Sequence, residues 1–131
     1  MFMENKNSGY KQQEYKIPVK RYCQTLQLKN DPALIEEYIR IHSEQYAWPE
    51  IREGIRSIGI LEMEIFQIGN QLFMIVETPL DFDWEEAFTR LAQLPRQQEW
   101  EEFVARFQLS DPKASSSEKW QLMDRIFYLY K

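Results

Sequence analysis

The sequence predicts an α+β fold built around one antiparallel sheet. Two observations carry this prediction. The apolar runs ILEMEIFQI (60–68) and QLFMIVET (71–78) are separated only by Gly69-Asn70, a two-residue hairpin signal that pairs them antiparallel. Four further segments carry apolar residues at the three-to-four spacing of amphipathic helices, two before the hairpin and two after it.

The segment before the hairpin predicts a strand and two helices. VKRYCQTLQL (19–28) is the expected first strand. Asp31 is a suitable N-cap, and Pro32 occupies the first helical position, where its missing N–H costs nothing. One side of this helix carries Leu34, Ile35, Tyr38, Ile41 and His42. Pro49 ends it, and a second short helix is expected to run to Gly59, which suits a C-terminal cap.

The segment after the hairpin predicts two more helices and a closing strand. Asp83 and Glu86 form a D-x-x-E helix start, and a further helix follows Pro95. The apolar sides of these helices carry Trp84, Ala87, Phe88, Leu91, Trp100, Phe103, Val104 and Phe107. Residues 110–118 are a loop by composition, and residues 120–130 are expected to form the last strand. The resulting order, β-α-β-β-α-β, is the ferredoxin-like arrangement with each helix in two pieces.

The third and last strands are apolar on both faces, whereas helices cover only one face of such a sheet. The other face is therefore expected to meet a ligand or a second subunit. We expect a homodimer packed sheet to sheet, a dimeric α+β barrel, with a pocket on or beside that face. Residues 19–131 form the predicted domain, and residues 1–18 form a polar, flexible extension.

Composition excludes several classes of partner. The chain has 131 residues and a formal net charge of -5, with no local basic run, so neither a nucleic acid nor an anionic membrane is an expected partner. No apolar stretch is long enough to span a bilayer, and the N-terminus lacks the apolar segment of a signal peptide. Cys23 is the single cysteine, which fits a reducing cytoplasm.

Few residues are suited to chemistry. The sequence has no glycine-rich phosphate loop, no CxxC motif and no second histidine, so neither a metal site nor a cofactor is expected. Cys23 and His42 could form a nucleophilic pair, although free cysteines are mostly buried packing residues. Tyr38 and His42 lie four residues apart and emerge on one helix face. His42 is either a core residue bonded to a backbone carbonyl or an acid–base group, since imidazole titrates near neutral pH.

Other candidates have two interpretations each. Trp100 is at core spacing, but its polar surroundings, QQEWEE, also suit a platform for a sugar ring. Glu62, Glu64 and Glu77 alternate with apolar residues and are expected to be solvated, unless the open sheet face forms a pocket in which they reach ligand hydroxyls.

Four segments together resemble the L-rhamnose mutarotase family over about residues 19–130. They are EEYIRIH with WPEI, the hairpin EIFQIGNQLFMIVE, PRQQEWEEF and the closing MDRIFYLY. The resemblance implies a homodimer that interconverts the anomers of a 6-deoxy sugar without metal or cofactor. It implies a catalytic role for His42 and a sugar contact for Tyr38. The family's tandem tryptophans fall on Glu99 and Trp100, and a further substrate-contacting tyrosine falls on Met63.

The chemistry implied by the resemblance needs no more than the sequence offers. Opening a pyranose ring removes a proton from the anomeric hydroxyl and adds one to the ring oxygen, and a positioned acid–base group accelerates such steps by about 10²–10⁴-fold. The departures at Met63 and Glu99 leave L-rhamnose and L-fucose both open as the substrate. The alternatives are a non-catalytic sugar-binding or regulatory dimer and, by analogy of fold alone, a cofactor-free monooxygenase or haem-handling protein.

Overall fold

A computed structural model describes residues 5–110, 113–114 and 116–131. One antiparallel four-stranded sheet has the order β2-β3-β1-β4. The strands are β1 (Val19–Gln27), β2 (Glu62–Ile68), β3 (Gln71–Pro79) and β4 (Gln121–Leu122). The helices are α1 (Pro32–Ile41), α2 (Pro49–Ser57), α3 (Trp84–Leu91), α4 (Gln97–Val104) and α5 (Ser116–Lys119), with 3-10 turns at Lys6–Ser8 and Ala105–Phe107. This arrangement confirms the predicted ferredoxin-like α+β fold.

Local chemistry sets the helix starts and the turns as the sequence predicted, whereas α1 ends at Ile41, well before the predicted end at Pro49, which begins α2. The carboxylate of Asp31 accepts hydrogen bonds from the first-turn amides of α1, and Asp83 accepts one from the amide of Glu86 in α3. Gly59 follows α2 at φ +101°, and Gly69 takes φ +55° in the β2–β3 hairpin. Both angles lie in the left-handed region, where glycine carries no steric penalty.

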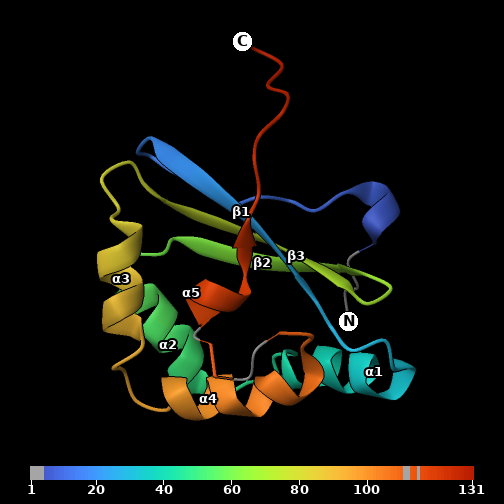
Figure 1. Ribbon diagram of the computed structural model, residues 1–131. Helices are drawn as coiled ribbons and strands as arrows, with labels where there is room; N and C mark the ends of the chain where they lie inside the picture. Colours follow the sequence, from blue (N-terminus) through green and yellow to red (C-terminus); the bar gives the residue numbers. More distant parts are fainter. Residues whose placement is uncertain (1–4, 111–112, 115) are drawn as a thin grey trace.

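The helices cover one face of the sheet, as Figure 1 shows. Leu72, Met74 and Val76 of β3 face the helices and are buried, because alternate residues of a strand point to the same face. Together with the apolar sides of the helices they form a single core. Gln24 lies on the same face of β1 and is 2% exposed, so a polar side chain is present within this layer.

The N-terminal extension lies on the opposite face of the sheet (Figure 1). The Tyr10 ring packs on Phe66 at 5.5 Å, and the Tyr15 hydroxyl donates to the Glu77 carboxylate at 3.2 Å. Glu77 also pairs with Arg21 directly across the β1–β3 ladder, at 3.0 Å. Glu77 is therefore buried and paired, contrary to the expectation that it is solvated. Residues 5–18 thus cover part of the face that the sequence left open.

The prediction of a last strand over residues 120–130 is wrong for most of its length. Only Gln121 and Leu122 pair with β1, and one further bond joins the Met123 amide to the Cys23 carbonyl. Beyond it the chain leaves the sheet and runs away from the fold (Figure 1). Within a single chain this segment finds no adjacent strand, so its β-like composition alone does not produce a ladder. The predicted loop 110–118 also contains the start of α5, while residues 111–112 and 115 lie outside the described part.

Candidate functional site

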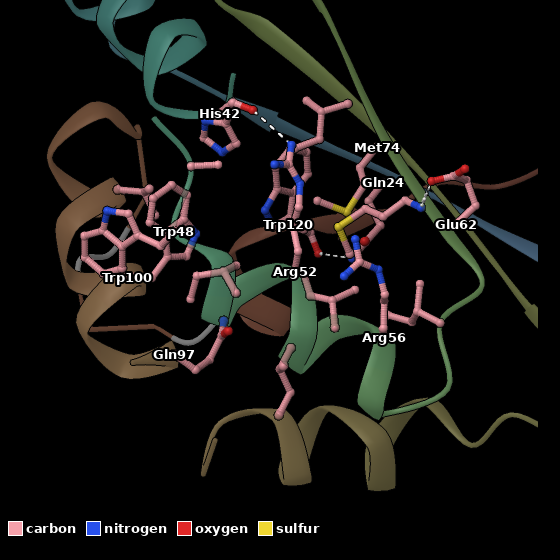
Figure 2. Close-up of a pocket in the computed structure, with 18 of the residues that line it drawn as sticks. Gln24, His42, Trp48, Arg52, Arg56, Glu62, Met74, Gln97, Trp100 and Trp120 are labelled. Carbon is pink, nitrogen blue, oxygen red and sulfur yellow. Dashed lines mark hydrogen bonds between the residues drawn. The ribbon is translucent and has the colours of Figure 1, made fainter. Parts of the chain in front are cut away.

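A cavity of about 460 Å³ lies between the helices and the sheet. Figure 2 shows most of the residues that surround it. They come from the helices α1 to α4 and the segments next to them, from the sheet and from the N-terminal extension. Its walls include Tyr38, His42, Trp48, Arg52, Arg56, Glu62, Met63, Met74, Gln97, Trp100, Gln108 and Trp120. Such a volume is within the range of small-molecule sites, and the mixture of aromatic, amide and charged side chains suits a polar ligand with one apolar face.

His42 is fixed at the C-terminal end of α1. Its Nδ1 lies 2.7 Å from the main-chain carbonyl oxygen of Tyr38, one helical turn earlier. Because a carbonyl oxygen only accepts, Nδ1 carries the proton in the neutral imidazole, and Nε2 keeps a free lone pair. The ring lines the cavity. The histidine therefore combines both interpretations of the sequence: it bonds a backbone carbonyl and it keeps one ring nitrogen for a ligand.

The surroundings of His42 favour its neutral form. Burial is the main cause that lowers the pKa of the imidazole below its usual value, and the positive charge of Arg52 lowers it further, while the bond to Tyr38 opposes both. An Nη2 of Arg52 also donates to the main-chain oxygen of His42 at 3.4 Å. A neutral imidazole with an unoccupied nitrogen can accept a proton from a ligand hydroxyl.

Tyr38 is buried beside His42. The two rings lie 4.2 Å apart between centroids, and Tyr38 is 3% exposed. Burial raises the pKa of the phenol to about 12, although a hydrogen bond with Gln108 lowers it. The hydroxyl therefore stays protonated near neutral pH and can act as a hydrogen-bond donor.

Aromatic rings form the wall next to His42. The Trp100 ring contacts the imidazole edge-on, with 5.2 Å between the ring centroids, and it contacts the Trp48 ring in the same way at 5.1 Å. Trp48 in turn stacks on Phe103 at 5.6 Å. The Arg96 guanidinium covers Trp48 at 4.0 Å from the outside. Trp48, which directly precedes α2, therefore lines the cavity as well.

The cavity brings together most of the residues expected in the site. Tyr38, His42, Met63 and Trp100 all line it. Glu99 lies outside this set: its carboxylate pairs with Arg96 at 3.2 Å on the surface of α4. Cys23 lies on the opposite sheet face, because Gln24 lines the cavity and neighbouring strand residues point to opposite sides. The Cys23–His42 pair considered from the sequence is therefore not formed.

Sequence reasoning missed several polar residues of the cavity. Gln24, Gln97 and Gln108 are each at most 4% exposed, and Arg52 and Arg56 lie one turn apart on α2. Gln24 could have been found from the sequence, because it is a polar residue on an otherwise apolar strand face. The other polar residues come from distant segments of the chain, and no sequence pattern connects them to the cavity. Within residues 5–110, 113–114 and 116–131, no group of three or more His, Cys, Asp or Glu side chains is placed to hold a metal ion.

An α+β fold with a solitary imidazole in a partly aromatic pocket defines a class of small proteins with one histidine beside a ligand-sized cavity. Comparison with known proteins identifies the family. The L-rhamnose mutarotase family model matches residues 21–129, and the chain belongs to this family. Members of this kind are sugar mutarotases, which interconvert the anomers of a sugar.

Two relatives of known sequence align with most of the chain. An L-fucose mutarotase of Xanthomonas campestris pv. campestris is 39% identical over 113 residues, which are 86% of this chain and 90% of that protein. A UPF0734 protein of Dictyostelium discoideum is 40% identical over 114 residues, covering 84% of this chain and 90% of that protein. The crystal structure of L-rhamnose mutarotase from Formosa agariphila matches with a TM-score of 0.61 and 19% identity over 84% of this chain and 98% of that one, which supports the fold.

None of the helices in the described residues is both long and apolar enough to traverse a bilayer.

Proposed function

We propose that this protein is a cofactor-independent mutarotase that interconverts the α and β anomers of a 6-deoxy sugar, with His42 as its acid–base group. The single observation that carries the proposal is the state of the imidazole. Nδ1 donates to the Tyr38 carbonyl over 2.7 Å, which leaves Nε2 as the ring nitrogen for a ligand. The His42 side chain lines the cavity. Membership of the L-rhamnose mutarotase family and the L-fucose mutarotase relative make L-rhamnose and L-fucose the candidate substrates.

The reaction requires proton transfers and the breaking and re-forming of the C1–O5 bond. Nε2 of neutral His42 takes the proton of the anomeric hydroxyl, the O–H electrons form the C1=O1 bond, and the C1–O5 bond breaks towards O5. The ring oxygen takes a proton from water. Rotation about the C1–C2 bond presents the other face of the aldehyde, and closure runs the same steps in reverse, with the imidazolium returning its proton to O1. Atoms and charge balance, and nothing is oxidised or reduced.

The neighbouring side chains would position the sugar. The protonated hydroxyl of Tyr38 donates a hydrogen bond to a sugar oxygen, while Trp100 covers the less polar face of the ring next to His42. Met63 contributes an apolar contact for the C6 methyl group from the β2 side of the cavity. Glu99 has no part in this proposal, because its carboxylate faces Arg96 outside the cavity.

A homodimer and a cytoplasmic location are parts of the same proposal. Ile126, Phe127, Leu129 and Tyr130 are 73–96% exposed, and the segment that carries them lies beyond the end of β4. An apolar strand-like segment of this kind is suited to pairing with a second copy of the chain, since monomeric proteins rarely leave such surface uncovered. The free, half-buried Cys23 agrees with a reducing compartment.

Saturation transfer between the anomeric proton signals of L-rhamnose, L-fucose and D-glucose tests the activity. We expect the protein to accelerate exchange for one 6-deoxy sugar, and His42→Ala to lower the rate by about 10²–10⁴-fold. His42→Gln keeps a polar side chain of similar size without the acid–base function. Full exchange in this variant would reject His42 as the acid–base group, whereas no exchange of any sugar with the wild type would favour a non-catalytic sugar-binding dimer instead.

A further inference from the structure

The N-terminal extension reaches the edge of the cavity that the rest of the chain builds. Gln13 lines the cavity, although it precedes the segment matched by the family model, residues 21–129. Its side-chain amide donates to the carboxylate of Glu62, at the start of β2. Tyr10 and Tyr15 anchor the extension on either side of Gln13, through Phe66 and Glu77 respectively. The extension therefore supplies a polar side chain to the site.

Glu62 borders the cavity at the start of the edge strand β2, and two bonds hold its carboxylate. One carboxylate oxygen accepts from Gln13, and the other accepts from the amide of Met63 at 3.0 Å. Figure 2 shows Glu62 and His42 on opposite sides of the cavity, with Arg56 on the Glu62 side. A carboxylate has about four acceptor positions, so these two bonds leave it able to accept from ligand hydroxyls. A hydrogen bond from a sugar hydroxyl to a carboxylate is charge-assisted, and such bonds are stronger than those between two neutral groups.

The position of Gln13 and Glu62 relative to His42 determines which hydroxyl of the sugar the Glu62 carboxylate can contact. In a pyranose, the C4 hydroxyl lies across the ring from the anomeric carbon. If the anomeric hydroxyl faces Nε2 of His42, the C4 hydroxyl points to the opposite side of the cavity. L-Fucose and L-rhamnose have opposite configurations at C4 (and at C2), so a carboxylate that binds this hydroxyl distinguishes the two sugars.

We propose that Gln13 and Glu62 form a specificity site for the sugar hydroxyl at C4, with the N-terminal extension as one wall. This inference rests on the proposed function for the placement of the anomeric carbon. Glu62 accepts the hydrogen bond from the sugar, and Gln13 is a positioning residue that fixes the carboxylate. Since the pair does not touch the reacting atoms, its loss changes KM and leaves kcat nearly unchanged.

A neighbouring pair in the same chain is a matched control. Gln12 donates to Glu64 at 3.4 Å, so it also joins the extension to β2, but neither residue lines the cavity. Gln13→Ala and Gln12→Ala each remove one contact between the extension and β2. Both glutamines are exposed, so neither substitution disturbs the core.

The experiment compares L-fucose, L-rhamnose and their 4-deoxy analogues. We expect Gln13→Ala and Glu62→Gln to raise KM by about five- to tenfold for the preferred sugar, the effect of one or two hydrogen bonds. Both variants should leave KM for its 4-deoxy analogue within twofold of wild type, and the double variant should be no weaker than Glu62→Gln alone. Equal effects on the sugar and its 4-deoxy analogue, or equal effects of Gln12→Ala and Gln13→Ala, would overturn the proposal.

Binding is measured separately from exchange. Titration of the ¹⁵N-labelled protein with each sugar follows the side-chain amide signals of Gln13, with those of Gln12 as the internal reference. We expect the Gln13 signals to shift and the Gln12 signals to stay. Shifts at Gln13 without anomer exchange would retain this site and reject the mutarotase proposal, whereas exchange without any shift at Gln13 would reject this site alone. If no sugar shifts Gln13, the inference is wrong.

Discussion

The imidazole of His42 donates from Nδ1 to the main-chain carbonyl of Tyr38 over 2.7 Å. This bond uses an oxygen left over at the end of α1, where the last carbonyls of a helix lack intrahelical partners. It satisfies one nitrogen, fixes the ring against Tyr38 and Trp100, and assigns the tautomer. The backbone, rather than a carboxylate side chain, therefore orients the ring.

Activity should fall on the acidic side with a midpoint below the ordinary histidine pKa of about 6.5. Burial and Arg52 lower the pKa of His42, and protonation removes the base from Nε2. As pH falls through the lowered pKa, kcat/KM decreases, and above it kcat/KM is constant. A pH series of exchange rates measures the midpoint. In Arg52→Gln the midpoint should rise, because one of the charges that disfavours imidazolium is gone; an unchanged midpoint would contradict this electrostatic role.

Tyr38→Phe should retain the orientation of His42 and weaken sugar binding. The bond to Nδ1 comes from the main chain of residue 38, so the substitution does not remove it. Losing the phenol hydroxyl removes one donor to the sugar, and we expect KM to rise by about three- to tenfold. The NMR shifts of the His42 ring should match those of wild type. Because the pKa of Tyr38 is about 12, no alkaline loss of activity due to this residue is expected below about pH 10.

Trp100 and Glu99 are adjacent in sequence, but their substitutions should differ in effect. Trp100→Phe replaces the indole that contacts His42 and borders the cavity with a smaller ring. Because less aromatic surface then covers the sugar, we expect kcat/KM to fall by about tenfold. Glu99→Gln alters only a surface pair with Arg96, so activity should stay within twofold of wild type. Initial exchange rates at several sugar concentrations separate the two outcomes. A loss in Glu99→Gln as large as that in Trp100→Phe would mean that Glu99 reaches the sugar.

Removing the C-terminal segment should change the assembly state and leave the fold of the chain intact. Residues after Met123 make few contacts with the sheet, and Phe127 is 76% exposed. Truncation after Asp124, or the double substitution Phe127→Asp with Leu129→Asp, should convert a dimer into a single chain in sedimentation at micromolar concentration. Tyr130→Phe is the matched control and should keep the dimer. A wild type that sediments as one chain would contradict the proposed assembly.

Local sequence signals determined most of the fold. Asp31, Asp83, Gly59 and the Gly69 turn act within a few residues, so their spacing was sufficient to place helix ends and the hairpin. The Tyr38–His42 pair is equally local, since both residues lie within one turn of α1. The apolar runs on either side of Gly69-Asn70 also identified the strands β2 and β3.

The last strand and the composition of the pocket depended on contacts far apart in the chain. Residues 123–130 have the composition of a strand, yet a strand requires a partner ladder that a sequence pattern does not reveal. Glu99 and Trp100 are neighbours whose side chains point to different sides of α4, so only the placement of α4 against α1 decided which one meets His42.

By itself the sequence determined the order of the elements, their caps and a histidine facing its tyrosine, because these follow from interactions between residues close together in the chain. Only the tertiary structure decided that α2, α4 and the sheet enclose a cavity around that histidine, and that Gln13 of the N-terminal extension reaches Glu62 across 49 residues. The physical reason is that the walls of a pocket come from segments distant in sequence, whose separation is fixed by the packing of the whole core.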